Sequence, residues 1–198
     1  YRDITVFDKE GTVNVDRSGK TLDAVKNMKL KSGDQVMVGN ESFTRLCLDD
    51  DKFIYVQEDT KFSLKAEGTA QDSRTSIFVT EGKIIAEVQN KLSDDSSFDI
   101  VTPNTTMSIR GTIAAVDVRL IVDELGKIFA ETANVVLEGS VYISMFSDSG
   151  TSSGIANAGE SVQLKSECDL TDFGNEVPEQ ILSTQPISEA VKQIVEMG

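Results

Sequence analysis

The chain has 198 residues and a formal net charge of −14, from 33 acidic and 19 basic side chains. One domain with a tail is the ordinary arrangement at this length, and a hydrophobic content of 39% argues against disorder. The negative charge excludes a nucleic-acid-binding role, because phosphate recognition requires lysine and arginine. It disfavours direct binding to anionic lipid for the same reason.

Histidine is absent, and the only two cysteines are Cys47 and Cys168. The absence of histidine excludes Ser-His-Asp and Cys-His catalysis and most zinc sites. The two cysteines have no metal-ligand spacing. Either they pair when the ends of the domain come together, or each is a small buried side chain. The sequence therefore gives no catalytic residue, no metal ligand and no cofactor-binding residue, and we predict that the chain is not an enzyme.

Short strands separated by turns are predicted from the start of the chain. Residues 22–28 also fit one helical turn, because Leu22, Val25 and Met28 fall at helical spacing. The N-terminal strands are predicted at Ile4–Val6, Gly11–Val15, Gln35–Val38, Phe43–Leu48, Phe53–Val56 and Thr60–Ala66.

The second half of the chain continues the pattern. Strands are predicted at 75–80, 83–89, 97–102, 105–109, 113–122, 127–131, 134–137, 140–146 and 161–165. Repeated glycine turns at Glu81-Gly82 and Glu138-Gly139, and at Gly33-Asp34 and Gly159-Glu160, favour stacked units. We predict an all-β, mostly antiparallel, stacked or solenoid-like domain with a short C-terminal helix, and an ordinary sandwich is the alternative.

The C-terminal part of the chain has a different character. We divide the sequence into a β domain at residues 1–170 and a tail at residues 171–198. The tail carries an apolar stripe at helical spacing, formed by Ile187, Val191, Ile194 and Val195. A helix this short is marginal alone, so we expect it to dock on the β domain or to continue into a following domain.

Three polar features have both a structural and a functional interpretation. Arg110 could hold an anionic ligand, but we expect a structural arginine that snorkels or pairs with a nearby acid such as Asp99 or Asp117. The run Asp49–Asp51 could hold calcium, but acids in a hairpin turn are usually solvated. The segment Gly150–Gly154 lacks the lysine of a phosphate-binding loop, so we expect a loop tip.

One ordered set of motifs resembles the FecR-type extracytoplasmic domain. A Thr-Pro step ends one strand and an Arg-Gly-Thr element opens another, and turns and strands with the family's spacing precede them. The similarity covers about residues 28–120. The matching residues are Gly33, Asp34, Val36, Gly39, Ser42, Leu46, Leu48, Asp50, Ile54, Val56, Thr60, Gly82, Thr102, Pro103, Arg110, Gly111 and Thr112. Asp51 and Ala114 depart from the pattern, where a glycine and an aromatic residue are usual.

The resemblance implies a sensory or regulatory domain of a bacterial envelope protein. Such a domain would be extracellular or periplasmic, anchored by a segment upstream of Tyr1, and would signal across the membrane by binding a partner protein through strand edges and loops. A surface module that binds glycan or wall polymer is the alternative. Glycoside hydrolysis by paired carboxylates is the remaining enzymatic alternative, but no acidic residue lies within a recognisable catalytic motif. The sequence does not identify the partner or the oligomeric state.

Overall fold

The computed structural model describes residues 2–89, 92–147, 149–171 and 173. Within these residues the chain forms fifteen β-strands and no helix, so the all-β, mostly antiparallel prediction is confirmed. The strands are β1 (Ile4–Glu10), β2 (Val13–Arg17), β3 (Lys20–Asp23), β4 (Gln35–Val38), β5 (Phe43–Leu48), β6 (Lys52–Val56), β7 (Thr60–Gly68), β8 (Ser73–Val88), β9 (Ser97–Val101), β10 (Thr105–Ile109), β11 (Ile113–Val122), β12 (Ile128–Glu138), β13 (Ser140–Ser147), β14 (Gly150–Asn157) and β15 (Ser161–Glu167).

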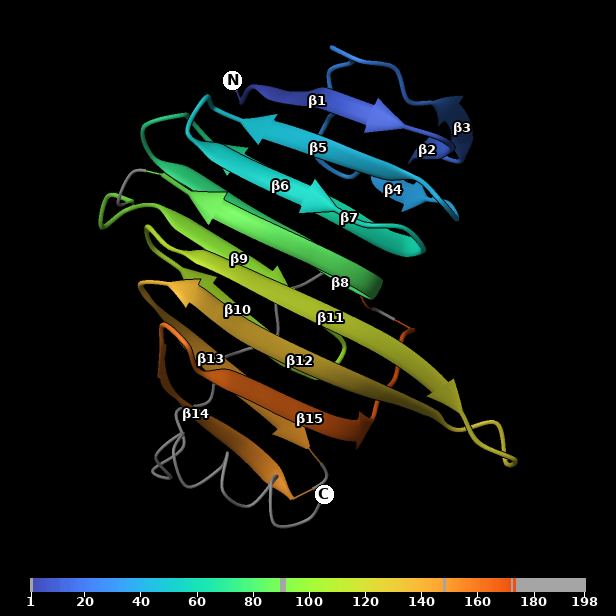
Figure 1. The fold of residues 1–198 in the computed structure, drawn as a ribbon, viewed down its shortest axis with the longest axis vertical. Helices are drawn as coiled ribbons and strands as arrows, with labels where there is room; N and C mark the ends of the chain where they lie inside the picture. The colour runs from blue at the N-terminus through green and yellow to red at the C-terminus, as the bar shows by residue number, and fades with distance from the viewer. Residues whose placement is uncertain (1, 90–91, 148, 172, 174–198) are drawn as a thin grey trace.

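The strands form two layers that face each other (Figure 1). Within each layer the strands follow one another along the long axis of the molecule. The first layer, sheet A, has the order β1-β5-β6-β8-β11-β12-β15. The second layer, sheet B, has the order β3-β2-β4-β7-β8-β9-β10-β13-β14. Neighbouring strands pair antiparallel except β8 and β9, which are parallel. After β8 the chain places two strands in sheet B, two in sheet A and two in sheet B, which is how the stack grows.

Alternating side chains form the core between the layers. In β4 the valines Val36 and Val38 are buried and their neighbours are half-buried, which is the pattern of a strand with one face on the core. Both sheets contribute to one continuous cluster, with Ile54 and Ile84 from sheet A and Phe62 and Ile100 from sheet B. The period of two along the strands therefore predicts the core correctly.

Strand β8 belongs to both layers. Its first part pairs with β7 and β9 in sheet B, and its second part pairs with β6 and β11 in sheet A. The change of layer occurs at Gly82, whose φ of +104° is a left-handed conformation that favours glycine. The strands predicted at 75–80 and 83–89 are thus one strand, bent where the sequence indicated a turn.

Three further predictions are wrong. The strands predicted at 127–131 and 134–137 are the single strand β12. Residues 22–28 form no helical turn, because Leu22 lies in β3 and the following residues are irregular. The expected loop tip at Gly150–Gly154 is the first part of β14, which pairs along its whole length with β13. The residues of this segment are small and polar, so no apolar alternation in the sequence indicates a strand. Pairing with β13 nevertheless makes it one.

The predicted C-terminal helix at 187–195 lies outside the described residues. Within the described part of the chain, no helix is long and apolar enough to cross a bilayer.

Candidate interaction surface

The Thr-Pro turn between β9 and β10 is a buried link between the two layers. Asn104 donates from Nδ2 to the carbonyl oxygen of Ala130 in β12 at 2.9 Å. Its Oδ1 accepts the hydroxyl of Thr132 at 2.6 Å, and its backbone carbonyl accepts the amide of Phe146 at 2.8 Å. Asn104 is 1% exposed. The segment that most resembles the FecR motif therefore joins sheet B to sheet A.

Thr102 and Thr105 complete this link. Their hydroxyls lie 2.7 Å apart, and the backbone amide of Thr105 donates to the Thr102 hydroxyl at 2.9 Å. Asn134 of β12 reaches the Thr105 hydroxyl at 3.4 Å. Buried polar groups of this kind stabilise a fold only when they are hydrogen-bonded. The turn is thus structural, and its side chains face the core rather than a ligand.

Arg110 lies beside a nearby acid, as expected, but that acid is Asp94 and not Asp99 or Asp117. Its guanidinium donates to the backbone carbonyl of Ser93 at 2.7 Å and lies 3.8 Å from the carboxylate of Asp94, at the surface. Asp99 instead accepts the hydroxyl of Ser108 at 2.7 Å. Burial raises the pKa of Asp99, and the hydrogen bond from Ser108 opposes this.

The Gly-Asp turn before β4 is held by a buried carboxylate. Asp34 accepts both Nε and Nη2 of Arg17, at 2.9 and 2.7 Å, and also the backbone amide of Lys31 at 2.8 Å. The hydrogen bonds that Arg17 donates to Asp34 raise the pKa of Arg17. A bidentate pair of this geometry fixes orientation as well as charge. The buried Asp34 carboxylate therefore ties the Arg17 side chain of β2 to the backbone of the turn before β4.

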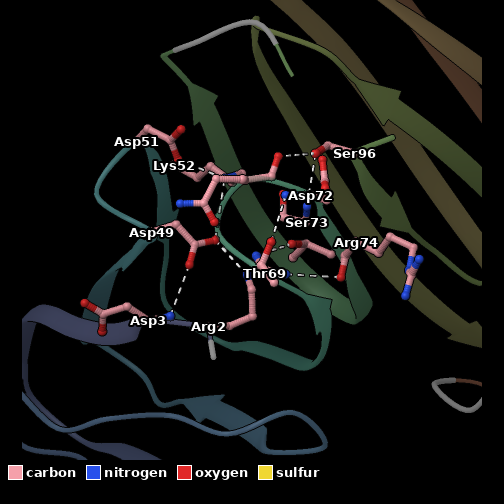
Figure 2. Close-up of polar contacts among 12 residues, drawn as sticks. Arg2, Asp3, Asp49, Asp51, Lys52, Thr69, Asp72, Ser73, Arg74 and Ser96 are labelled. Carbon is pink, nitrogen blue, oxygen red and sulfur yellow. Dashed lines mark hydrogen bonds and ion pairs between the residues drawn. The ribbon is translucent and has the colours of Figure 1, made fainter. Parts of the chain in front are cut away.

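Two carboxylates of the acidic run between β5 and β6 are also structural, which corrects the expectation that the run is solvated, whereas Asp50 is exposed as expected. Asp49 is buried and accepts Nε of Arg2 at 2.7 Å, with the Lys52 ammonium 3.6 Å away (Figure 2). Lys52 is itself 1% exposed and pairs with Asp51 at 2.8 Å. Asp49 and Asp50 have φ of +53° and +62°, as in the tightest hairpin turns.

Arg2 extends this cluster across the two layers. Its second nitrogen donates to the carbonyl of Glu67 at 2.9 Å, and its third donates to the Thr75 hydroxyl at 2.6 Å. Asp49 belongs to the β5–β6 turn of sheet A, whereas Glu67 and Thr75 belong to β7 and β8 of sheet B. The arginine fork therefore connects the layers at one side of the stack, as Asn104 does further along it.

The two cysteines are both free and half-buried, so the disulfide alternative is wrong in this structure. Burial raises the pKa of both thiols. Among the described residues no three Cys, Asp or Glu side chains are placed to hold a metal ion.

The sheet edges differ between the two ends of the stack. At the N-terminal end, β3 has only four residues, and the edge of β1 is covered by the segment 27–30, which makes backbone hydrogen bonds to Ile4 and Val6. At the C-terminal end, β14 and β15 have eight and seven residues and pair on one side only among the described strands. Open edges are the parts of a sheet that accept a partner strand.

The β11–β12 hairpin projects sideways beyond its neighbouring strands, at the lower right of the view (Figure 1). Pairing of β11 with β8 stops at Val118 and pairing of β12 with β15 begins at Phe129, so residues 122–127 lie beyond both neighbouring strands. This tip, residues 122–127, carries two apolar side chains in solvent, Val122 at 65% and Leu125 at 83% exposure.

A shallow polar hollow of about 520 Å³ lies on the outer face of sheet B. It is lined by Asp16, Gln35, Ser63, Lys65 and the ring of Phe173, among others. Its side chains are mostly small and polar, and no catalytic pair is apparent among them.

Residues 34–142 match the sequence profile of the family described as FecR protein. The chain belongs to the FecR family. The resemblance on about residues 28–120 is therefore confirmed, and the match extends through β11 and β12 into β13. FecR proteins are regulatory rather than catalytic, so membership supports a regulatory role in signalling.

One solved structure with a partial likeness comes from Parabacteroides distasonis and is described as "a putative anti-sigma factor". It shares 18% identity with this FecR chain, the alignment covers 68% of this chain and 60% of that one, and the TM-score is 0.45. Comparison with curated proteins gave no match.

The FecR motif residues therefore have structural roles in this chain. Asp34, Thr102 and Thr112 are buried, and Gly82 lies where β8 changes layer. No sequence pattern indicates the role of Asn104 within the motif or the pairing of Arg2 with Asp49. The exposed hairpin tip was not predicted either, although its two apolar residues beside the Asp-Glu pair at 123–124 were a usable signal.

Proposed function

We propose that this FecR domain is an extracytoplasmic sensory domain that binds a partner protein through the tip of the β11–β12 hairpin and passes the signal across a membrane. The observation that carries the proposal is the exposure of Val122 and Leu125 on a ribbon that projects from the stack. Large apolar side chains that project together into solvent are typical of protein contact sites.

The shape of the tip favours a pocket or groove on the partner. Beyond Ile121 on β11 and before Ile128 on β12, the ribbon has no described neighbouring strand other than its own pair, so both of its sides are accessible. A single apolar anchor inserted into a pocket supplies much of the binding energy in many protein interfaces. Leu125, at the turn, is the anchor, and Val122 lies beside it at the end of β11.

The charge of the chain indicates what surrounds that pocket. The formal net charge is −14, and Asp123 and Glu124 lie between the two apolar residues of the tip. Complementary charge accelerates association and selects partners. The partner therefore presents an apolar pocket with a basic rim. The negative charge of the domain also keeps it away from nucleic acid and from anionic lipid.

The signalling role is tested in the complete protein in its own bacterium. Transcripts that change on deletion of the gene and recover on complementation define the output. Complementation with Leu125→Asp is expected to leave protein abundance unchanged but to abolish recovery, because a carboxylate cannot enter an apolar pocket.

The matched control is Val25→Asp. Val25 is also apolar and 56% exposed, but it lies beside β1 at the other end of the stack. It is expected to restore the output fully. Full recovery with Leu125→Asp would show that the tip is not the contact.

Binding of a glycan or wall polymer is the second candidate, and the polar hollow on sheet B favours it. Hydroxyl, amide and charged side chains surround one aromatic ring there, and sugars are bound by such combinations. Calorimetry with wall-polymer fragments tests it. Heat that is lost on Gln35→Ala would support the candidate, and no heat with any fragment would dismiss it.

A further inference from the structure

The outer face of sheet A carries a group of aromatic side chains around one arginine. In β5 and β6 the core-facing residues include Thr44, Leu46 and Ile54, so by alternation their neighbours face outward. Phe7 joins them from β1, at the point where the register with β5 shifts by one residue. We call this set the aromatic patch, and its members are Phe7, Phe43, Arg45, Phe53 and Tyr55.

Ring contacts hold the aromatic patch together. Phe7 and Phe53 meet edge to face, with ring centroids 6.4 Å apart and planes at 77°. The guanidinium carbon of Arg45 lies 5.6 Å from the ring centroids of both Phe43 and Tyr55. Aromatic rings attract a cation that lies over them. Arg45 is therefore held in place by two rings, while Phe7 beside it remains 53% exposed.

The guanidinium of Arg45 is available to another molecule. Its side chain is exposed, and it makes no hydrogen bond or ion pair within the described part of the chain. Its register partner Asp8 accepts the backbone amide of Lys9 at 2.9 Å, and Glu87 accepts the hydroxyl of Tyr55 at 3.2 Å. A guanidinium presents a planar fork of donors that matches a carboxylate. The aromatic patch therefore suits a ligand that combines an apolar side chain with a carboxylate.

The tip of the β11–β12 hairpin has this combination. Leu125 is 83% exposed, and the acidic residue before it, Glu124, is also exposed. Asp123 accepts the backbone amides of Leu125 and Lys127 at 2.9 and 2.8 Å, so this carboxylate shapes the turn. Glu124 makes no such bond to any residue that the structure describes. Glu124 and Leu125 are thus the groups that the tip presents to a partner.

A molecule cannot place its own tip on its own aromatic patch. The register line through Arg45 continues through Tyr55 and Ile85 to Ala115 in β11. Neighbouring strands are about 4.8 Å apart, so β11 lies about 14 Å across the sheet from β5. Val122, where the tip begins, lies about 24 Å further along β11 than Ala115, at about 3.4 Å per residue. The tip and the patch can therefore meet only between two molecules.

We propose that the hairpin tip of one molecule docks on the aromatic patch of a second copy, with Leu125 against the rings and Glu124 paired with Arg45. This inference rests on the proposed function, because it names another copy of the chain as the partner of the same tip. Arginine and aromatic residues are the side chains that most often dominate the binding energy of a protein interface. The patch supplies the apolar surface and the basic group that the tip requires.

The contact joins two different surfaces, which determines the form of the assembly. Each copy has one tip and one aromatic patch, so the copies add head to tail and give an open chain or a closed ring. A hairpin tip buries little area, so the contact is weak and depends on a high local concentration. Molecules that are gathered at one place would associate, and dilute molecules would not.

Sedimentation equilibrium of the purified 198-residue chain tests the contact. The average mass of the parent is expected to rise above the 21.5 kDa of one chain between about 10 μM and about 1 mM, the range of a weak complex. Arg45→Glu and Glu124→Arg should each weaken association at least about tenfold, because like charges then meet. Lys20→Glu is the control for Arg45→Glu, since Lys20 is exposed in β3 and the charge change is the same. Circular dichroism verifies the fold of each variant.

Mixing the two variants separates a specific contact from a general effect of charge. In the mixture, the unchanged patch of Glu124→Arg meets the unchanged tip of Arg45→Glu, so association returns although neither variant associates alone. Three outcomes would overturn the inference: a parent that stays monomeric to about 1 mM, a control that is weakened as much as Arg45→Glu, and a mixture that does not recover.

Photo-crosslinking from position 125 in cells distinguishes this inference from the proposed function. A crosslinked product that contains two copies of the chain is expected. A product that contains a different protein, together with a monomeric chain in solution, would overturn the second copy as partner and leave partner binding through the tip intact. The absence of any product while signalling is intact would overturn both.

Discussion

Asn104 in the β9–β10 turn and Ala130 in β12 are joined by a hydrogen bond of 2.9 Å that crosses from one sheet to the other. The same amide group lies 3.3 Å from the carbonyl of Leu164 in β15. Two sheets that face each other through apolar side chains can slide, whereas a satisfied polar group fixes one arrangement. The Thr-Pro motif therefore specifies how the layers of this FecR domain align.

Replacing Asn104 with alanine is expected to lower the free energy of unfolding by about 3 kcal/mol, because buried partners lose their hydrogen bonds. Urea unfolding followed by circular dichroism measures it. Asn157→Ala is the control, since Asn157 is exposed and its amide bonds only to Glu160. That variant should change stability by less than about 0.5 kcal/mol. Equal effects of the two would refute a special role for Asn104.

Gly82→Ala is expected to destabilise the fold more than any other glycine substitution in a turn. An added Cβ would lie 2.2 Å from the hydroxyl and 2.4 Å from Cα of Thr60. Gly126→Ala provides the matched control, because Gly126 also has a positive φ but nothing within 4 Å. The control should cost about 1 kcal/mol from backbone strain alone. A thermal melt in which both variants behave alike would contradict the layer change at Gly82.

Arg2→Met is expected to lower stability by about 3 kcal/mol, because it removes one partner of a buried ion pair and leaves Asp49 less compensated. Arg2→Lys should not restore it, since an ammonium cannot bridge Asp49, Glu67 and Thr75 at once. Arg74→Met removes an exposed pair with Glu67 and should cost at most about 0.5 kcal/mol. Urea midpoints that are the same for all three variants would disprove the clamp.

Asp99 gives the domain a pH dependence of known sign. Burial raises its pKa above the ordinary value of 3.8, while the hydrogen bond from Ser108 opposes the shift. The folded state therefore keeps this proton to higher pH than the unfolded state, and stability falls as pH rises through the folded pKa. Asp99→Asn should be more stable than the parent at neutral pH, and the gain should vanish below the ordinary value. A gain that persists in acid would point to another cause.

Much of the fold could be predicted from the sequence. The strands at Gln35–Val38, Phe43–Leu48 and 105–109 have the predicted bounds, because a buried face imposes a period of two. The layer exchange in β8 could not be predicted, since Glu81-Gly82 is equally typical of a hairpin turn. Strand β14 was missed because its residues are small and polar, and its strand conformation depends on pairing with β13.

The interaction surface was less accessible to sequence reasoning. Arg110 attracted a functional interpretation because a cation in an apolar pattern is unusual, yet it only holds a neighbouring loop. Asp49 appeared solvated because its partner Arg2 is distant in sequence. Leu125, between Glu124 and Gly126, belongs to no alternating run, so hydrophobic periodicity did not indicate it; its apolar side chain beside two acidic residues was the available signal. Its exposure follows from where β8 and β15 end, which only the pairing shows.

The most direct test of partner binding is photo-crosslinking in living cells. A photoreactive phenylalanine analogue replaces Leu125 in the complete protein, and a second strain carries it at Val25. The account predicts one discrete crosslinked protein from the Leu125 position only, lost on addition of Val122→Asp. The same crosslink from both positions, or none from the tip while signalling is intact, would contradict contact through the β11–β12 hairpin.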